Sequence, residues 1–389
     1  MSDVVFIANG IVGKNPSLSG GETRFIEIAK NWQKAGDKIN LLSPSGGKGL
    51  CEKLDLKVQL HCSSRLTSAK RFLFIGRFLE SFFIPTSLNS FKKGIIYCTN
   101  EQLYDVIPGV LLKLRNPGNI RLAVVVHWLP PAAWWRRKQS SFLNSLFFLI
   151  SERIGLFLGC LFADKLLPVS ESTHEQIKKS VFGRFFDKKV KTVFCGVNYK
   201  RVRLISKEAI TKKYEAVFMK RIQAVKGIFD LINVWEMVVK KIPQAKLVIM
   251  GSGVDEESAK KIVLDKRLTK NIEFLGTVFD EKEKFTKIAE SKVFLLPSYE
   301  ENWAIVIGEA MAAGIPVVCY LLKELEEVWH DFAVFVPVGN QKIMAEKIIE
   351  LLRNPEKSQK ISKRALEFVR QYDWEKIAKN EKSIILDQT

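Results

Sequence analysis

Residues 297–319 constrain the fold of this 389-residue chain more than any other stretch. They follow four apolar residues, 293–296, which predict a short buried strand. Within the stretch, residues 303–313 predict a helix that ends at Gly314, and residues 317–319 begin another strand. Strand, loop, helix and strand in this order predict an open α/β sheet, in which ligands bind beyond the carboxyl ends of the strands.

Two glutamates in this stretch stand eight positions apart, Glu301 in the predicted loop and Glu309 in the predicted helix. Eight helical residues rise about 12 Å, a little over two turns. Because carboxylates accept hydrogen bonds and donate none, they suit paired sugar hydroxyls. The spacing therefore favours two carboxylates that serve two parts of one elongated ligand.

The same residues resemble the signature of retaining glycosyltransferases of the GT-B fold, in particular glycosyltransferase family 4. The family pattern is Glu, seven residues, Glu, and then Ala-Met-Ala-x-Gly-x-Pro-Val-Val, which Glu301, Glu309 and residues 310–318 match. The resemblance implies an α/β chain with two Rossmann-like, doubly wound domains that face each other across a cleft. It also implies that Glu301 holds hydroxyls of the transferred sugar and that Glu309 holds those of the ribose.

Residues 302–304 depart from the family pattern. The family usually has Gly-Phe-Gly there, whose backbone N–H groups bind the sugar and the diphosphate, whereas this chain has Asn302, Trp303 and Ala304. The small Ala304 still permits a close approach, and Asn302 offers an additional side-chain contact. The resemblance implies that these three residues bind the donor.

A second match follows the predicted strand 216–219. Arg221 and Lys226 stand at the spacing of the two cations that hold the donor diphosphate in the family, and Lys220 replaces the usual glycine. Paired cations neutralise phosphates and stabilise the charge that develops on a leaving group. The resemblance thus implies that Arg221 and Lys226 bind the donor and, together with Glu301, take part in catalysis.

Glycines mark two further candidate loops. Gly251 follows the predicted strand 247–250 and resembles the start of the family's Gly-x-Gly loop beside the nucleotide base. Gly20 and Gly21 stand in a loop before the predicted helix 22–35, where helix N–H groups can approach a phosphate or a sugar closely. They resemble the glycine loop of the family's first domain and are expected to help bind the donor. This loop is not the dinucleotide fingerprint Gly-x-Gly-x-x-Gly, so no nicotinamide cofactor is indicated.

A histidine stands at the carboxyl end of the predicted strand 122–126, where a ligand crevice is expected. This residue, His127, matches the histidine that family members keep near the transferred sugar. The resemblance implies a catalytic role in which His127 positions the sugar from the first domain. A purely structural histidine is the alternative.

Residues 195–198, Cys-Gly-Val-Asn, resemble the family's Asn-Gly-Val-Asp junction, which places the domain boundary near residue 200. We expect residues 1–200 to form an acceptor-binding domain, with a C-terminal helix of about residues 370–389 packing back on it. Residues 201–369 are expected to form the domain that binds the nucleotide-sugar donor.

Positive charge is concentrated in the first half of the chain. Residues 1–200 hold 29 Lys and Arg against 14 Asp and Glu, which is +15 of the formal net charge of +19. Basic and aromatic residues mix in the stretches 65–93 and 134–150, a composition that suits an anionic bilayer interface. We expect this half to dock on an anionic membrane, with an ordinary core helix and a solvated basic end as the alternative. No nucleic-acid-binding motif supports a nucleic-acid partner.

The chain begins with a predicted strand rather than a basic leader, and no run approaches the roughly 20 apolar residues that span a bilayer. We therefore expect a cytoplasmic protein that is peripheral on the cytosolic membrane face. The six cysteines are scattered, without metal-ligand spacing or companion histidines. Neither a disulfide nor a metal site is indicated.

The resemblance implies transfer of a hexosyl group from a UDP- or GDP-sugar to a glycan or lipid-linked acceptor, with retention of configuration. The nucleotide sugar is a co-substrate, and no metal ion or other cofactor is expected, because two cations do the work of magnesium. Two other classes stay open. A non-hydrolysing sugar-nucleotide epimerase shares the architecture, and a catalytically idle basic binding module is suggested by Lys220 and Asn302.

Overall fold

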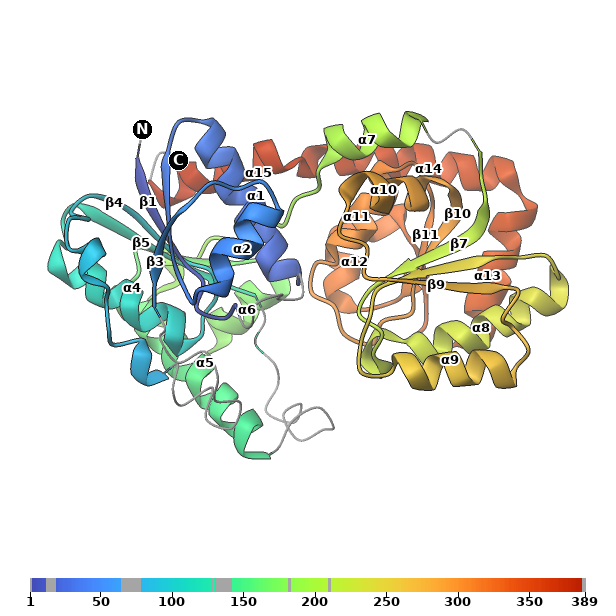
Figure 1. Cartoon of the computed structure of the whole chain (residues 1–389), viewed down its shortest axis with the longest axis horizontal. Helices are drawn as coiled ribbons and strands as arrows, with labels where there is room; N and C mark the ends of the chain where they lie inside the picture. The colour runs from blue at the N-terminus through green and yellow to red at the C-terminus, as the bar shows by residue number, and fades with distance from the viewer. Residues whose placement is uncertain are drawn as a thin grey trace. The chain divides into compact units, whose positions relative to one another are not determined.

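The computed structural model describes residues 2–11, 19–63, 78–127, 129, 142–180, 183–208 and 211–386. By internal contacts the chain splits into two compact units, Met1–Cys195 with Trp374–Thr389, and Gly196–Asp373. Each unit is built on a parallel, six-stranded sheet with helices on its faces (Figure 1). The predicted α/β class with two doubly wound sheets is confirmed.

The sheet of the first unit has the strand order β3-β2-β1-β4-β5-β6, and all neighbouring pairs are parallel. The strands are β1 (Asp3–Ile7), β2 (Lys38–Ser43), β3 (Gln59–Cys62), β4 (Gly94–Cys98), β5 (Ile120–Val126) and β6 (Lys165–Pro168). The order reverses between β1 and β4. This is the switch point at which doubly wound sheets bind ligands beyond the strand ends.

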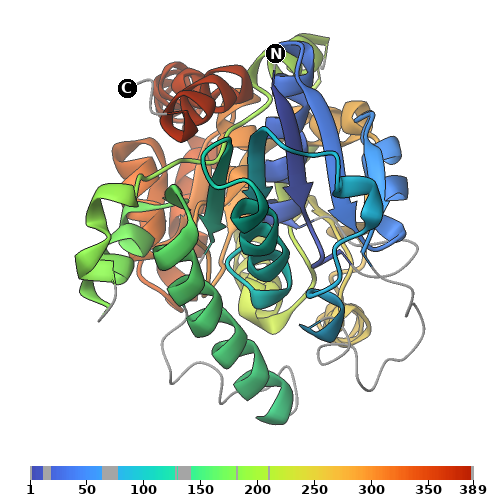
Figure 2. The same cartoon turned by 90° about the vertical axis from the view of Figure 1, so that its left-hand side faces the viewer.

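Helices cover both faces of the first sheet. They are α1 (Gly20–Lys34), α2 (Gly46–Lys53), α4 (Leu103–Arg115), α5 (Phe142–Phe162), α6 (Glu171–Lys179) and α15 (Trp374–Ile385). Helix α4 packs against α5, and Figure 2 shows the two in front of the sheet, while α1 packs against α15. Val5 and Ile7 of β1 belong to the core under α4 and α5, whereas Phe6 between them contacts Phe25 of α1 on the other face.

Polar contacts of α15 fix the end of the chain to the first unit. The Trp32 indole N–H donates to the Ala378 carbonyl at 2.8 Å. The Arg24 guanidinium lies 2.5 Å from the Glu381 carboxylate, and both groups are almost completely buried. The Tyr97 hydroxyl donates to the same carboxylate at 2.5 Å. A helix from the end of the sequence thereby becomes part of the core built by its beginning.

The sheet of the second unit has the order β12-β11-β10-β7-β8-β9, again with parallel neighbours. The strands are β7 (Tyr214–Met219), β8 (Leu247–Met250), β9 (Ile272–Gly276), β10 (Ser291–Leu296), β11 (Val317–Tyr320) and β12 (Val334–Val336). The order reverses between β7 and β10, so the crevice is expected at their carboxyl ends.

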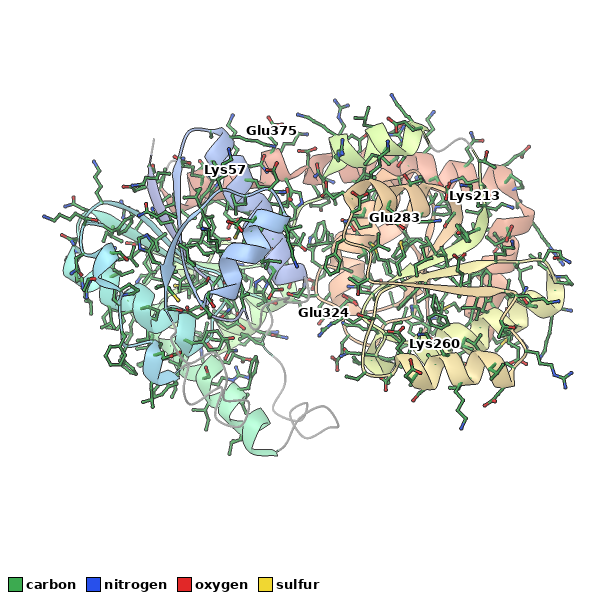
Figure 3. All side chains as sticks on the ribbon, in the orientation of Figure 1. Lys57, Lys213, Lys260, Glu283, Glu324 and Glu375 are labelled. Atoms are coloured by element: carbon green, nitrogen blue, oxygen red, sulfur yellow. The ribbon has the colours of Figure 1, made fainter. Side chains whose placement is uncertain are left out.

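Two layers of helices enclose the second sheet. The helices are α7 (Tyr199–Glu208), α8 (Ile228–Lys241), α9 (Glu256–Asp265), α10 (Glu281–Ala289), α11 (Ile305–Ala312), α12 (Lys323–Trp329), α13 (Gln341–Arg353) and α14 (Pro355–Val369). Helix α8 contacts α9 and α13, and α11 contacts α7, α10 and α14, so the two groups lie on opposite faces (Figure 1). Lys213 and Lys260, which are labelled in Figure 3, are exposed residues of this unit.

Two predicted helix starts are wrong. Helix α11 begins at Ile305, because Ala304 caps it in the left-handed conformation with φ 53°, which leaves Trp303 and Ala304 outside the helix. Helix α1 begins at Gly20, so Gly20 and Gly21 form its first turn instead of a preceding loop. Ser19 caps this helix: its hydroxyl accepts the Glu22 N–H, and the Glu22 carboxylate accepts the Ser19 N–H at 2.9 Å. This reciprocal capping offsets the low helix propensity of the two glycines.

None of the helices in the described part of the chain combines the length and the apolar character of a bilayer span. Residues 65–77 of the first predicted membrane-contacting stretch and residues 134–141 of the second lie outside the described residues. Exposed apolar side chains in the described residues include Phe82 and Phe83 within the first stretch, and Ile150 and Ile154 on α5.

Candidate active site

Three loops meet at the carboxyl ends of β7, β8 and β10 because two glycines allow their backbones to touch. A Cβ atom at Gly227 would lie 1.8 Å from the Pro297 carbonyl oxygen, and the φ of Gly227 is 76°. A Cβ atom at Gly251 would lie 2.0 Å from the Lys220 carbonyl oxygen, and its φ is 139°. Any other residue at these two positions would push the loops apart. Gly251, predicted to bind the donor, thus also sets the position of Lys220.

The carboxylate of Glu301 is the centre of this edge of the sheet. Lys220 Nζ lies 2.8 Å from Glu301 Oε2, and Lys226 Nζ lies 3.1 Å from Glu301 Oε1. The Ser298 hydroxyl donates to Oε1 at 2.9 Å, and Lys226 Nζ also donates to the Glu300 carbonyl at 2.5 Å. Only 6% of the Glu301 side chain is exposed. The structure therefore brings together two residues that the sequence predicted, Glu301 and Lys226, with Lys220 as an additional partner.

Charge, not burial, decides the protonation of Glu301. Burial alone would raise the pKa of this carboxyl, but the charges of Lys220 and Lys226 and hydrogen bonds from Lys220 and Ser298 lower the pKa to about 2. Burial lowers the pKa of Lys226, and the Glu301 charge offsets part of that effect. The cluster therefore holds an ionised carboxylate at any physiological pH.

Arg221 follows Lys220 at the end of β7 and is exposed. Its charge acts on Lys226, which places the three cations in one local field. Within the described part of the chain, the Arg221 guanidinium forms no hydrogen bond or ion pair. An exposed guanidinium next to a buried ammonium is a suitable pair of donors for the oxygens of a diphosphate.

The second predicted glutamate is also buried and paired. Glu309 Oε1 lies 2.9 Å from Lys284 Nζ, and the same ammonium lies 4.1 Å from the centre of the Phe285 ring. Lys284 belongs to α10, and the sequence analysis did not single it out. No local pattern marks it, because its partner is 25 positions away and on another helix.

The residues that replace the glycine-rich loop have different surroundings. The Trp303 ring is buried and packs edge-on against Trp329, with ring centres 4.6 Å apart, and against Tyr372 at 5.3 Å. The Trp329 indole N–H donates to the Trp303 carbonyl at 3.0 Å. The aromatic cluster therefore fixes the loop that follows Glu301, and the Trp303 side chain belongs to the core of the unit.

A solvent-open hollow with a volume of about 130 Å³ lies in the first unit, at the switch point of its sheet. Its walls are Ala8, Gly10, Ile11, Ser19, Gly21, Glu22, Phe25, Thr99, Asn100 and His127. A Cβ atom at Gly21 would lie 3.3 Å from His127 Nε2. The structure therefore brings together Gly21 and His127, two of the predicted residues, while Gly20 is exposed at the start of α1.

Hydrogen bonds hold His127 at the end of β5. Its Nε2–H donates to the Thr99 carbonyl at 2.9 Å, which fixes the proton on Nε2. Its backbone N–H donates to Glu101 Oε2 at 3.0 Å. Burial lowers the pKa of His127 to about 4. The imidazole is therefore neutral at physiological pH.

A buried polar cluster of Glu101, Gln102 and Glu152 lies behind His127, and the sequence analysis did not identify it. Burial raises the pKa of Glu101 to about 7, although the hydrogen bond from the His127 N–H opposes this. Burial and the Glu101 charge raise the pKa of Glu152 to about 8. The Glu152 carboxylate has no hydrogen-bond partner among the described residues, but Arg153 Nε lies 3.8 Å from Glu152 Oε1 and its charge opposes part of this rise. No motif marks these residues, because β4 and α5 come together only in the fold.

Comparisons with known proteins agree with this architecture. Residues 201–368 match the family model described as glycosyl transferases group 1. An uncharacterized glycosyltransferase of Haemophilus influenzae is 23% identical over 374 residues, which cover 95% of this chain and 97% of the relative. A phosphatidyl-myo-inositol mannosyltransferase of Mycobacterium leprae is 33% identical over 156 residues, but these cover only 39% of this chain and 41% of that enzyme.

Solved structures share the fold over the full length. The Anabaena protein HepE in complex with UDP and glucose has a TM-score of 0.73 at 15% identity, covering 99% of this chain and 100% of that one. Sucrose-phosphate synthase from Thermosynechococcus elongatus has a TM-score of 0.73 at 18% identity, covering 100% and 99%. At such low identity the likeness defines the fold, and the family match adds the activity class. Residues 201–368 therefore match the group 1 glycosyltransferases, and the whole chain has the GT-B fold.

Proposed function

We propose that this glycosyltransferase moves a hexosyl group from a UDP- or GDP-sugar to a glycan or lipid-linked acceptor, with retention of configuration and without a metal ion. The observation that carries the proposal is the cluster of Lys220, Arg221 and Lys226 around the ionised Glu301, at the strand ends of the unit that matches the family model. Similar folds solved with UDP and with UDP-glucose support a nucleotide-sugar donor.

In this proposal the second unit binds the donor. Arg221 and Lys226 bind the diphosphate, since cations at the end of a strand neutralise its charge and stabilise the departing nucleoside diphosphate. Glu301 accepts hydrogen bonds from the transferred sugar, and Glu309 accepts those of the ribose. The backbones of Gly251 and of residues 302–304 line the same edge of the sheet. Because the cations neutralise the leaving group, no metal ion is assigned to the site.

The chemical step breaks the bond between the anomeric carbon and the phosphate oxygen, and the acceptor oxygen forms a new bond on the same face of the sugar. The departing phosphate oxygen takes the proton of the acceptor hydroxyl. The chain's own groups bind and orient the reactants. Glu301 is too strongly paired with cations to act as a base, because its pKa of about 2 leaves it without affinity for a proton at neutral pH.

In this proposal the first unit binds the acceptor, and its His127 and the start of α1 contact the sugar of the donor. The neutral imidazole of His127 suits a hydrogen bond with a sugar hydroxyl, and Gly20 and Gly21 let the N-terminus of α1 approach a ligand closely. The hollow bordered by Gly21 and His127 is the place where we expect a sugar to meet this unit.

In this proposal the acceptor is lipid-linked, and the protein binds it at the cytosolic face of an anionic membrane. The net charge of +15 in residues 1–200, the exposed rings of Phe82 and Phe83, and the exposed Ile150 and Ile154 on α5 support this surface. Relatives whose names include a phosphatidyl-myo-inositol mannosyltransferase support a lipid acceptor. Flotation with acidic and neutral vesicles at low salt tests it: equal binding to both would contradict a docking role for charge.

Donor hydrolysis tests the function as a whole. The purified full chain is incubated with UDP-, GDP- and ADP-sugars in the presence of EDTA, beside Glu309→Ala and, as a matched surface control, Glu236→Ala. We expect nucleotide release from one donor that resists EDTA, survives in the control and is lost in Glu309→Ala. Appearance of an epimeric sugar nucleotide would identify an epimerase instead. Binding without turnover of any donor or acceptor would identify an idle binding module.

A further inference from the structure

We propose that Lys220 is a positioning residue that acts as the lasting counter-ion of Glu301, so that Lys226 is released from this carboxylate to bind the donor diphosphate. The inference rests on the proposed donor site and adds a division of labour between two lysines that otherwise contact the same group. It concerns the position at which this chain has lysine where the family pattern has glycine.

The position of Lys220 is fixed by its backbone. Its N–H donates to the Met250 carbonyl at 3.2 Å, and its own carbonyl lies against Gly251, where a Cβ atom would be only 2.0 Å away. The side chain runs from this fixed point to Glu301 Oε2, at 2.8 Å. Among the described residues, Lys220 Nζ has no other hydrogen-bond partner, so Glu301 is the group that it holds.

Lys226 is arranged differently. Its Nζ is shared between the Glu300 carbonyl at 2.5 Å and Glu301 Oε1 at 3.1 Å. Oxygen Oε1 also accepts the Ser298 hydroxyl at 2.9 Å. Departure of Lys226 therefore leaves Oε1 with one hydrogen bond and a free lone pair for a sugar hydroxyl, while Oε2 keeps the ammonium of Lys220.

The formal charges of the cluster agree with a transfer of Lys226 from Glu301 to the diphosphate. Lys220, Arg221 and Lys226 together with the Glu301 carboxylate carry a formal charge of +2, which matches the −2 of a diphosphate diester. Without Lys220, binding of Lys226 to the phosphates would leave a buried carboxylate with no ammonium beside it. An unpaired buried carboxylate is costly and tends to take up a proton. Lys220 therefore keeps Glu301 ionised in both states of the site.

The other titratable groups around Glu301 do not replace Lys220. From the loop after β7 only Arg221 and Lys226 add positive charge, and both are assigned to the donor. From the loop after β10 the neighbours are Ser298 and Glu300, which carry no positive charge. From β11 the buried Cys319 thiol faces the carboxylate, and burial and the Glu301 charge raise its pKa, so it stays neutral.

A double-mutant cycle on nucleotide binding tests the proposal. UDP and GDP are titrated calorimetrically into the full chain and into Lys220→Met, Glu301→Gln and the double variant, with the exposed Lys240→Met as the matched control. We expect Lys220→Met to weaken binding by about tenfold in the native background, because Lys226 then stays on Glu301, and by less than threefold when residue 301 is Gln. Equal weakening in both backgrounds would overturn the proposal, because Lys220 would then contact the phosphates directly.

The pH profile of donor turnover gives a second readout that a merely structural role would not move. In Lys220→Met the decline of kcat/KM at acid pH is expected to begin at least one pH unit higher than in the native protein. The reason is that one cation fewer then counteracts the effect of burial, which opposes the ionisation of Glu301. Lys220→Arg is expected to restore the native profile. An unchanged acid limb in Lys220→Met would overturn the proposal even if turnover by the native protein establishes the donor reaction. Absence of both turnover and nucleotide binding in the native protein would instead refute the proposed function itself.

Discussion

The two units handle buried carboxyl groups in opposite ways. Glu301 in the second unit and Glu101 and Glu152 in the first all lie near the switch point of a parallel sheet, and burial acts to raise the pKa of each. Two lysines and a serine reverse this effect at Glu301 and lower its pKa to about 2. Among the described residues, Glu152 has only the longer ion pair with Arg153, at 3.8 Å, and its pKa is about 8, while the pKa of Glu101 is about 7. Partners, rather than depth, determine the charge of a buried carboxyl group.

This difference suits the two halves of the proposed reaction. A diphosphate needs a site rich in fixed cations, and the ionised Glu301 keeps these cations together before the donor arrives. In the first unit the imidazole of His127 is neutral and Glu152 is largely protonated at neutral pH, so these two buried groups add little charge to the site. Such a site suits uncharged hydroxyl groups, which form hydrogen bonds without the need for a counter-ion.

The largest expected effect is a loss of stability when the buried Glu381 carboxylate loses its ion-pair partner. Arg24→Ala leaves Glu381 buried beside Tyr97 alone, and removal of one partner from a buried pair typically costs about 3–5 kcal/mol. We expect the free energy of unfolding of the first unit, measured in urea, to fall by that amount. The control is Arg121→Ala, which breaks a half-exposed pair with Asp164 and should cost less than about 1 kcal/mol. Equal costs for the two variants would contradict the dominant role of the buried partner.

Among the variants of the second unit, removal of the Lys226 ammonium should lower catalysis most. Lys226→Ala takes away the ammonium assigned to the leaving diphosphate, and the loss of one such stabilising group typically lowers rates by about 10²–10³-fold. We expect that decrease in kcat/KM for the donor, while Lys240→Ala on the exposed face of α8 leaves it unchanged. A variant at position 226 that keeps kcat/KM within about threefold would refute the assignment of Lys226 to the diphosphate.

Local sequence located the charged residues at the strand ends of the second unit, but not the side chains that pair with them. Arg221, Lys226, Glu301 and Glu309 could be identified because each belongs to a short run with a fixed spacing at a strand end. The partners of these residues could not be identified from the sequence. Lys284 of α10 contacts Glu309 of α11, 25 positions away, and only the packing of α10 brings the two together.

The starts of α1 and α11 also could not be predicted from local sequence. Ala304 favours helices, but the turn that carries Glu301 puts it in the left-handed conformation at φ 53°. Gly20 and Gly21 disfavour helices, but the cap formed by Ser19 and Glu22 includes them in α1. In both places a contact with a neighbour outweighs the intrinsic preference of the residue.

The stability of the first unit should depend on pH through Glu152. Its folded-state pKa of about 8 lies above the value of an unfolded Glu, so the folded unit holds a proton that the unfolded chain has lost. Stability from this group is therefore present at acid pH and declines as the pH rises towards 8. Glu152→Gln removes the charge at constant shape and should stabilise the unit by on the order of 2 kcal/mol at pH 8.5, with little effect at pH 5. The exposed Glu175→Gln is the control; a gain of equal size at both pH values would contradict the role of the buried charge.

The smallest expected effect separates the charge of Glu101 from its hydrogen bond. The Glu101 carboxylate accepts the His127 N–H at 3.0 Å, and a Gln side chain can accept the same bond through its carbonyl oxygen. We therefore expect Glu101→Gln to keep kcat/KM at pH 6 within about threefold while it removes any inflection near pH 7, where the native Glu101 titrates. Glu101→Ala leaves the N–H without this acceptor and should lower kcat/KM by about three- to tenfold, the worth of one hydrogen bond. Equal losses in the two variants would mean that the charge itself is needed, and the first unit would then resemble the second in relying on an ionised carboxylate.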